Sequence, residues 1–592
     1  MINISYKLNN FINNNIALNL IKIQNKKKDI IFLLFLFISN SFFEGLTVLS
    51  IFPFLSMLTD TDNFYQREIV FLIANFFGIK NSSGLILPIT ILFIFFILVS
   101  LLFKLISFWK TAHISAKIQI DFSRLLFRKN LYQTYINYTK ADSSKMITAS
   151  TTYSIAGGKI INAFLDIIAA SIMSLFIFIA LIIFNWKISI ILILSIGFIY
   201  IIISYFIKKK LYTLGLQTAK SDRYSIKTLQ EGFGGFRDVL LNSAQEIFIN
   251  NLTIHQKISK FNSAKTNFYS IFPRYFIESL ALIIMSLIAF IYINSLDSKT
   301  YFILPTLGTY ALAFQKLLPL TQQIFNNWTI YNFRIPVGKI LLDELNHKNE
   351  LEIPVRKISQ RNIKESIKCK NVAFKYQKKQ KIYNLKDINL TIKKGEHIGI
   401  LGSSGSGKST LLDLIMGLLK PTAGKILIDE IDLHNQNNPN LVFNWRKSIA
   451  HVPQNIFLME GTIAQNITFG LDESSINFSK IVKSAEKANL LEFVSNTKNG
   501  FETLVGERGV QISGGQRQRI GIARALYNEC SILILDEATN ALDIKTEQNI
   551  LKTLNKLKGE VTIITVTHKT NQSEFYDRLF EISNGSLIEI NK

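Results

Sequence analysis

The sequence predicts a two-part chain, in which a helical membrane domain of six spans precedes a soluble α/β domain with a phosphate-binding loop. Three observations predict this fold class. Six stretches of about 20 mostly apolar residues occur before position 321. Only 18% of the residues are charged and 48% are hydrophobic, whereas ordinary soluble domains have roughly 25% charged residues. Beyond position 360, short apolar strands alternate with amphipathic helices around a glycine-rich loop.

Length and charge support the same division. The chain has 592 residues, about four times the ~150-residue prior for one domain, so at least two domains are expected. Residues 361–592 hold 31 Lys and Arg against 24 Asp and Glu, which leaves +17 of the net +24 on residues 1–360. Positive charge in the apolar half is typical of a membrane protein with basic cytoplasmic loops. Because no recognition motif accompanies this charge, nucleic acid is not an expected partner.

Four segments follow from these patterns: a cytoplasmic leader at 1–29, an all-α domain with six spans at 30–341, a linker at 342–360 and the α/β domain at 361–592. The first span is too long and too polar at its centre for a cleavable signal peptide, so we expect it to be retained. The six expected spans are Ile30–Leu58, Leu85–Phe108, Ile160–Phe184, Ile188–Ile207, Phe272–Ile293 and Tyr301–Leu320.

Basic residues determine the expected orientation. The leader and the connections 108–159 and 208–270 are rich in Lys and Arg, which places both termini in the cytoplasm of a multi-pass inner-membrane protein. The two long connections have helical periodicity, so they are expected to form cytoplasmic helical hairpins. Near the ends of these hairpins, Leu131–Tyr138 and Tyr224–Phe233 are candidates for contact with the soluble domain, with Tyr132–Tyr135 and Thr228–Gln230 as the touching segments.

The firmest motif lies in the α/β domain, where an apolar strand, a glycine loop and a helix follow one another. It matches G-x-x-x-x-G-K-[ST] and predicts a nucleoside triphosphate site with bound Mg²⁺. Backbone N–H groups of such a loop surround phosphate oxygens, its lysine contacts the β and γ phosphates, and its serine hydroxyl ligates Mg²⁺. The nucleotide-binding residues assigned to this loop are Gly402, Ser403, Gly405, Ser406, Gly407, Lys408, Ser409 and Thr410.

Two acids follow a second apolar strand, CSILILDEAT. Asp536 is expected to hold the metal, and Glu537 to act as general base toward the attacking water. Capping of the next helix is the structural alternative for such a pair. His568 follows a third strand, where an imidazole can contact the γ-phosphate and orient the water. A lone histidine in this position is more often structural, and the other six histidines show no metal-ligand spacing.

A second anion-binding helix start occurs in QISGGQRQRIGIARAL, where Ser513, Gly514, Gly515 and Gln516 open a helix. It cannot serve the phosphate that the first loop already surrounds. Here the chain resembles ATP-binding cassette (ABC) transporters, because Ile512–Gln516 matches their LSGGQ signature with Ile in place of Leu. The resemblance covers essentially the whole chain, and six motifs occur in the expected order.

The resemblance implies further site residues. Tyr376 is implied to stack on adenine, and Gln454 to ligate Mg²⁺ and sense the transmembrane domain. Residues 506–509 resemble an exporter loop near the hairpin ends. Residues 540–543 resemble the loop that joins two ATP sites, with Asn540 where serine is common and Asp543 at its end. The implied catalytic residues are Glu537 as the base, His568 and Gln454. The implied Mg²⁺ ligands are Ser409, Gln454 and Asp536.

The family also implies an architecture and a partner. In ABC transporters the 402–409 loop of one subunit and the 513–516 segment of another enclose each ATP between them. One chain has six spans and one ATPase domain, so the expected particle is a homodimer of a type IV exporter fold that works by alternating access. Both Glu537 and His568 are present, which makes two hydrolytic sites in the dimer.

Local sequence resembles the lipid-linked oligosaccharide flippases and their polysaccharide- or glycolipid-exporting relatives, notably in FEGLTVLSIFPFLSML and FPRYFIESLAL. An ATP-driven flippase for a lipid-linked glycan among membrane lipids is therefore the leading prediction. An exporter of lipids, peptides or drugs is the alternative, and a regulatory ATPase without transport is a third reading. The intact catalytic residues and six spans weigh against the third reading.

Charged side chains inside membrane spans require an explanation, because placing a charge in the bilayer costs free energy. Arg274 and Glu278 are one helical turn apart, which favours an intrahelical salt bridge over contact with a lipid diphosphate. For Lys104 and Lys316, snorkelling to an interface is favoured over a place in a water-filled cavity, and Glu44 and Asp166 are similarly ambiguous. Segment 63–78 is amphipathic and is expected to form a short external helix or to pack against the first span.

Overall fold

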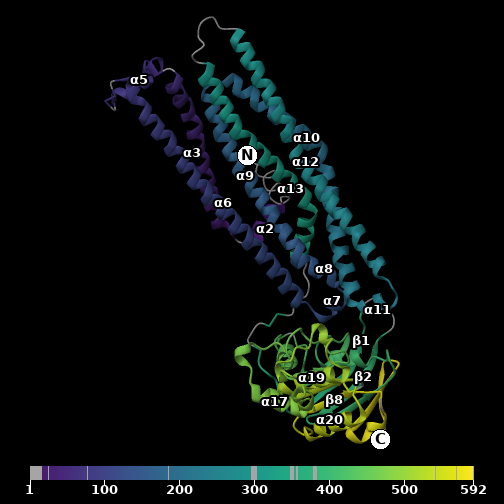
Figure 1. The fold of residues 1–592 in the computed structure, drawn as a ribbon. Helices are drawn as coiled ribbons and strands as arrows, with labels where there is room; N and C mark the ends of the chain where they lie inside the picture. Colours follow the sequence, from purple (N-terminus) through teal and green to yellow (C-terminus); the bar gives the residue numbers. More distant parts are fainter. Residues whose placement is uncertain are drawn as a thin grey trace. The chain divides into compact units, whose positions relative to one another are not determined.

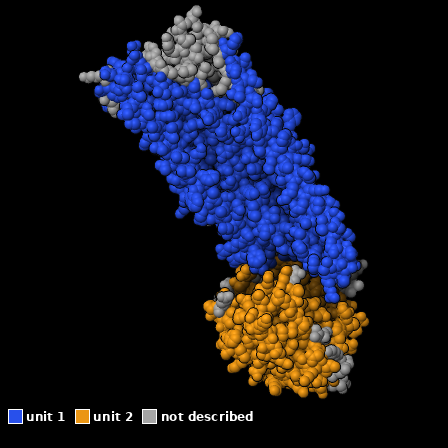
Figure 2. All heavy atoms as spheres, viewed as in Figure 1, with its two compact units in different colours: residues 1–131, 141–349 blue, residues 132–140, 350–592 orange. Residues whose placement is uncertain are grey.

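The computed structural model divides the chain into two compact units (Figure 2). Unit 1 comprises residues 1–131 and 141–349, and unit 2 comprises residues 132–140 and 350–592. The chain is described over 16–590 without 25, 60, 77, 80, 185, 295–302, 347–352, 355–357, 378–382, 436, 540–541 and 569. Much of the predicted linker and the start of the predicted sixth span lie outside these residues.

Throughout its described residues, unit 1 is helical (Figure 1). Its long helices are α3 (Lys27–Thr59), α6 (Ile86–Leu131), α9 (Ser154–Phe184), α10 (Trp186–Gly234), α12 (Gln245–Asn294) and α13 (Ile303–Asn346). The shorter segments are α2 (Ile16–Gln24), α4 (Thr61–Tyr65), α5 (Glu68–Phe76), η1 (Ser82–Leu85), α8 (Ser143–Thr148), η2 (Ala149–Tyr153) and α11 (Phe236–Leu241). Much of segment 63–78 is helical in α4 and α5, and its Phe64 and Ala74 are buried together with Met57 of α3, so it also packs against the first predicted span.

Three helical stretches among the described residues are long and apolar enough to cross a membrane, namely Lys27–Leu58, Ser82–Leu131 and Ser143–Ile183. They contain the first three predicted spans. The fourth and fifth predicted spans lie within α10 and α12, and the described part of the sixth lies within α13. Apolar residues cover much of the outer surface of α6, where Leu102 is 60% exposed and Phe108 76%. Such exposure suits contact with lipid rather than water.

Packing between helices forms two main cores in unit 1. Near the N-terminus, α2 and the start of α3 pack with α6, α9 and the end of α13, around buried residues such as Leu33, Phe122 and Ile160. The second core joins α3, α9 and α13 through Val48, Ile177 and other small or branched residues. The helix α2, which falls in the predicted leader, is therefore part of the packed unit.

Both long connections, 108–159 and 208–270, are largely helical and form hairpins, as predicted, but the second reverses later than expected. The predicted tip, Tyr224–Phe233, lies entirely inside α10, which continues to Gly234, and the chain turns at α11. Glycine costs a helix only about 1 kcal/mol. A Cβ on Gly232 would be 3.3 Å from Phe248 of α12, so the close helix contact favours glycine inside the helix rather than at its end.

The first hairpin contains α7 (Tyr135–Lys140), which belongs to unit 2 although it lies between α6 and α8 in sequence (Figure 2). Tyr135 and Ile136 pack against the buried core of unit 2, and Lys140 donates a hydrogen bond to the Tyr376 carbonyl at 3.0 Å. The prediction that Leu131–Tyr138 contacts the soluble domain is thereby confirmed. Contact of Thr228–Gln230 with a soluble domain stays a prediction.

Unit 2 contains two sheets. The antiparallel sheet has the order β2-β1-β4-β5, and the larger sheet has the order β10-β9-β3-β8-β7-β6, parallel except for the β9–β10 pair. The strands are β1 (Ser366–Phe374), β2 (Leu385–Lys393), β3 (His397–Leu401), β4 (Ala423–Ile428), β5 (Ile431–Asp432), β6 (Ile449–Val452), β7 (Ile532–Asp536), β8 (Thr562–Val566), β9 (Arg578–Ser583) and β10 (Ser586–Ile590).

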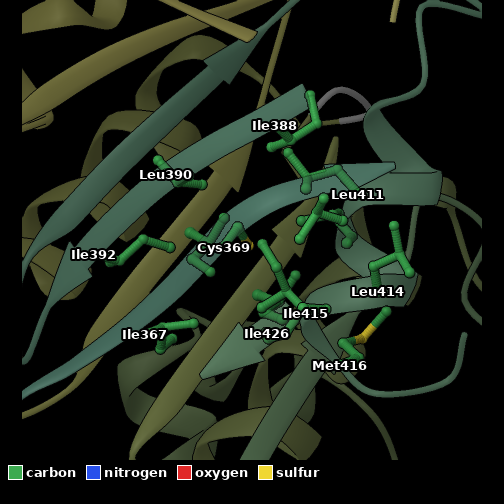
Figure 3. Packing of buried hydrophobic residues seen from close by; sticks show 14 of the residues in the cluster. Ile367, Cys369, Ile388, Leu390, Ile392, Leu411, Leu414, Ile415, Met416 and Ile426 are labelled. Carbon is green, nitrogen blue, oxygen red and sulfur yellow. The ribbon is translucent and has the colours of Figure 1, made fainter. Parts of the chain in front are cut away.

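Helices complete unit 2. They are α14 (Lys408–Ile415), α15 (Leu441–Arg446), α16 (Ile463–Ile467), α17 (Phe478–Lys487), α18 (Leu491–Ser495), α19 (Gly514–Tyr527) and α20 (Ile544–Lys556), with short 3₁₀ turns η4 (Glu473–Ser475), η5 (Gly500–Glu502), η6 (Glu507–Gly509) and η7 (Thr570–Phe575). Figure 3 shows side chains of α14, such as Leu411 and Ile415, meeting Cys369 and Leu390 of β1 and β2. This core fixes the loop before α14 at the carboxyl end of β3.

Candidate nucleotide site and membrane cavity

The glycine loop connects the buried strand β3 to α14, as the motif requires. Gly402 and Gly407 have φ angles of +153° and +112°, in the region that favours glycine. A Cβ on Gly402 would be 2.6 Å from the Ile582 carbonyl oxygen, and one on Gly407 would be 2.7 Å from Leu385. Any larger residue would displace the loop, so the backbone turns tightly here because these positions are glycine.

The polar groups of this loop suit phosphate. The Lys408 ammonium donates to the carbonyls of Gly402 at 2.7 Å and Ser403 at 3.0 Å, which holds the side chain over the loop. The buried Ser406 hydroxyl has no hydrogen-bond partner among the described residues. An orphaned buried hydroxyl is costly unless a ligand satisfies it. The loop therefore has the donors and the open backbone that a triphosphate needs.

Three strand ends bring the predicted catalytic residues together. His568 Nε2 lies 2.7 Å from one Glu537 carboxylate oxygen, and the Gln454 amide donates to the other at 2.7 Å. His568 is also 3.5 Å from Lys408 Nζ. Because β6, β7 and β8 are parallel neighbours, the residues that follow them meet at one sheet edge.

Glu537 itself has a φ of +51°, an unusual conformation for a residue with a side chain. Its backbone N–H donates to the Val566 carbonyl at 3.0 Å, which stabilises this turn after β7. Such backbone conformations persist when the surrounding structure determines them, and they cluster at functional sites. The alternative in which the two acids only cap the next helix does not fit, because Asp543, rather than Asp536 or Glu537, is the N-cap of α20.

Asp536 and Ser409 form the expected metal-binding pair. The Ser409 hydroxyl donates to Asp536 Oδ2 at 3.4 Å. Burial raises the pKa of Asp536, and the negative charge of Glu537 raises it further. A cation placed between these groups would relieve that repulsion, and a hydroxyl with a carboxylate is the oxygen donor set that Mg²⁺ prefers. The residues present thus fit Mg²⁺.

The remaining predicted residues lie on separate elements. The Tyr376 hydroxyl is 3.3 Å from that of Thr410, so the ring stands next to the start of α14. Ser513 caps α19 in a capping box, in which its hydroxyl accepts from Gln516 N–H and the Gln516 side chain accepts from Ser513 N–H. Within the described part of the chain, no hydrogen bond joins 513–516 to the 402–409 loop. Gly514 and Gly515 form the first turn of α19.

Some residues next to the site were not predicted. Asp413, one turn further along α14, has its pKa raised to about 6, mainly by burial and also by the charge of Asp536. The sequence could have indicated Asp413 as a residue near the site, because positions 409 and 413 are one turn apart and share a helix face. Lys140 was missed because its contact with Tyr376 spans 236 positions. Asn540 and Ala541 of the predicted joining loop lie outside the described residues.

Unit 1 contains a second candidate site, a cavity of about 680 Å³ between α3, α6, α9 and α13. Most of its wall is apolar, and its charged lining residues are Glu44, Lys104, Asp166 and Lys316. Lys316 Nζ is 2.7 Å from Glu44 Oε1, and the Ser100 hydroxyl donates to the other Glu44 oxygen. Lys104 and Lys316 therefore line a cavity, which was the alternative to the interface position favoured from the sequence.

Arg274 does not line this cavity. Its guanidinium Nε is 3.8 Å from Glu278 Oε2 on the same helix, and both side chains are nearly half exposed. The intrahelical salt bridge favoured from the spacing is confirmed. A role for Arg274 in a cationic cavity is not supported, because the proline-containing helix α12 does not contribute to the cavity wall.

A helical unit followed by an α/β domain with this loop and this catalytic edge matches the arrangement expected for an exporter of the ABC type. Residues 385–540 match the family model "ABC transporter". Unit 2 thus contains an ABC transporter ATPase domain, and the helices of unit 1 followed by this domain have the fold of an ABC exporter half-transporter.

Curated relatives cover most of the chain. The "ATP-dependent lipid A-core flippase" of Wigglesworthia glossinidia brevipalpis is 28% identical over 501 residues, 82% of each chain. The protein of the same name from Blochmanniella floridana is 29% identical over 492 residues, 80% of each chain. The solved structure of a bacterial Atm1-family ABC exporter with ATP bound matches with a TM-score of 0.71 over 91% of this chain and 93% of the other, at 18% identity. This last likeness supports the exporter fold.

Proposed function

We propose that the chain is an ATP-driven flippase or exporter of a lipid-linked oligosaccharide, polysaccharide precursor or other glycolipid in the bacterial inner membrane. The observation that carries this proposal is the unit 1 cavity, whose apolar wall contains two lysines. An apolar wall suits the lipid part of such a molecule, and ammonium groups suit its phosphate. The names of the two flippase relatives agree with a glycolipid cargo.

In this proposal the chain forms a homodimer with both termini in the cytoplasm. The 402–409 loop of each copy and the 513–516 segment of the other copy enclose one ATP. The capping box uses the N–H groups of Ser513 and Gln516, so the N–H groups of Gly514 and Gly515 in the first turn of α19 are the anion donors of this proposal. ATP contacts that exist only in the closed dimer favour closure, and hydrolysis removes them.

The proposed hydrolytic step uses the residues at the sheet edge. Glu537 accepts a proton from the attacking water, while His568 and Gln454 hold its carboxylate in position through the two 2.7 Å contacts. Lys408 and Ser406 neutralise and bind phosphate oxygens. Mg²⁺, held by Ser409, Asp536 and Gln454, would supply charge neutralisation of the phosphates. Tyr376 stacks on the adenine, and Asp543 stabilises the start of α20 next to the second site.

One screen tests the substrate class. The full chain in proteoliposomes is assayed for stimulation of ATP hydrolysis by lipid diphosphate sugars, phospholipids, peptides and cationic drugs, followed by a flipping assay for each molecule that stimulates. We expect stimulation and flipping with anionic glycolipids. Stimulation by peptides or drugs alone would favour the alternative exporter, and hydrolysis without movement of any molecule would favour the regulatory ATPase.

A further inference from the structure

The most informative unexplained feature is the carboxylate in the unit 1 cavity. Glu44 is a buried residue of α3, and its two oxygens are held by groups from two other helices. Lys316 of α13 forms the 2.7 Å ion pair, and Ser100 of α6 donates a hydroxyl. A site for an anionic cargo does not need a carboxylate for attraction, because a carboxylate repels phosphate. Glu44 therefore requires an explanation of its own.

The lysines of the cavity are not equivalent. The Lys316 side chain is 33% exposed and is paired with Glu44. Lys104 also lines the cavity, and its charge acts on Glu44, but it forms no ion pair in the described structure. Asp166, the other acid of the wall, accepts from Asn162 on its own helix at 3.0 Å. Besides Glu44, the charged groups of the cavity wall are thus the ammonium groups of Lys104 and Lys316 and the carboxylate of Asp166.

Pairing has an energetic reason. A lone ammonium in a membrane span costs several kcal/mol, and an opposite charge at hydrogen-bond distance offsets much of that cost. Glu44 supplies this charge to Lys316 when the cavity holds no cargo. A phosphate group that took the place of Glu44 would exchange one ion pair for another, so Lys316 would never lose its partner. A phosphate also has enough oxygens to contact Lys104 at the same time, which Glu44 does not.

We propose that Glu44 is an internal counter-ion of Lys316, which an anionic phosphate group of the cargo displaces to bind Lys316 and Lys104 together. The inference rests on the proposed function and names its specificity-determining residue. Glu44 makes the cavity selective, because a neutral lipid does not compete for Lys316. Its competition with phosphate also weakens cargo binding, which favours release of cargo after transport.

The test uses the full chain in phosphatidylcholine nanodiscs with two probes that share one tail, undecaprenyl diphosphate and uncharged undecaprenol. The readouts are direct binding of each probe and the probe concentration that gives half-maximal stimulation of ATP hydrolysis. Glu44→Gln removes the competing charge and should lower this concentration for the diphosphate by about tenfold. This factor corresponds to the low end of the coupling energies measured for close charge pairs. Lys316→Gln should raise it by about the same factor. The response to undecaprenol should not change.

Two further variants keep the result interpretable. Glu278→Gln is the matched control, because it removes the carboxylate of an ion pair that lies outside the cavity, and it should leave the response to both probes unchanged. Ser100→Ala keeps every charge but removes the hydroxyl that holds Glu44, so it should shift the response in the same direction as Glu44→Gln by about twofold to threefold. It carries the test if Glu44→Gln does not fold.

The outcomes separate the two proposals. If the diphosphate stimulates the wild-type chain and neither Glu44→Gln nor Ser100→Ala changes its half-maximal concentration, the counter-ion role is refuted and the proposed function stands. If the wild-type chain neither binds nor flips any anionic lipid, the proposed function fails and the counter-ion role fails with it. An equal gain in response to undecaprenol would show a general loosening of the cavity and would also refute the counter-ion role.

Discussion

Glu537 is the residue on which the proposed chemistry most directly depends. Its carboxylate is fixed by His568 and Gln454, and its backbone adopts a positive φ that few side chains tolerate. Both contacts orient a base without consuming its proton-accepting ability, provided that the histidine donates its Nε2 proton. This arrangement arises at the ends of three strands that are distant in sequence.

Replacement of Glu537 by glutamine keeps the size and the turn but removes the base. We expect Glu537→Gln to bind ATP normally, to accumulate a closed dimer, and to hydrolyse ATP at least about 100-fold more slowly, as for loss of a general base. Nucleotide binding, crosslinking and steady-state hydrolysis measure these three effects. Hydrolysis within a few-fold of the wild-type rate would contradict the assigned role.

Asp413 predicts a pH effect on stability. Its pKa in the folded state is about 6, above the ordinary value of 3.8, mainly because of burial and also because of the charge of Asp536. A raised carboxyl pKa means that the folded state holds the proton more tightly, so stability falls as pH rises from about 4 to about 6. Asp413→Asn should therefore stabilise unit 2 above pH 6, by about 1 kcal/mol once solvent screening of this partly exposed group is considered.

Thermal unfolding between pH 4 and pH 8 measures this effect. The difference between Asp413→Asn and the wild type should be largest above pH 6 and should become small near pH 4, where folded Asp413 is protonated and the unfolded carboxyl is only about half ionised. Asp387→Asn is the control, since Asp387 is exposed on β2. A pH-independent difference would exclude titration of Asp413 as the cause.

At the scale of elements, the sequence predicted the presence of the helices more accurately than the positions of the turns between them. Spans, hairpins and the strand–loop–helix unit were all predicted from apolar periodicity and from glycine spacing. The segment 224–233, expected near the end of the second hairpin, lies inside α10, where Gly232 is in close contact with Phe248 of α12. The pairing of Glu44 with Lys316 was not predictable, because it joins positions 272 residues apart and depends on how α3 and α13 pack.

The helix α7 has the clearest functional prediction of any single element. Tyr135 packs on the unit 2 core beside Tyr376, while Tyr138 on the same helix is 56% exposed. If α7 transmits the state of the membrane domain, Tyr135→Ala should reduce stimulation of ATP hydrolysis by cargo severalfold and leave unstimulated hydrolysis within about twofold. Tyr138→Ala serves as the matched control and should retain stimulation. Equal effects of both variants would contradict this role.

At the scale of the whole molecule, the proposed homodimer predicts a complementation pattern. Each ATP site would use Lys408 from one copy and Ser513 from the other. Chains with Lys408→Ala and chains with Ser513→Arg, when co-assembled, would leave one intact site in each mixed dimer and should recover part of the activity. A double variant co-assembled with wild type would leave no intact site in a mixed dimer.

Purified mixed dimers, selected with two different affinity tags, allow hydrolysis to be measured for both combinations. Activity in the first combination and its loss in the second is expected. The reverse pattern would show that each site is built from one chain and would refute the shared sites.

The division of the molecule into units has a practical consequence for dissection. The chain passes from one unit to the other three times, after residues 131, 140 and 349, because α7 is embedded in unit 2. A fragment that starts at residue 350 would therefore lack Tyr135 and Ile136 and would expose the apolar surface of unit 2 against which they pack. Such a fragment should therefore self-associate more readily than one to which the nine residues 132–140 are restored.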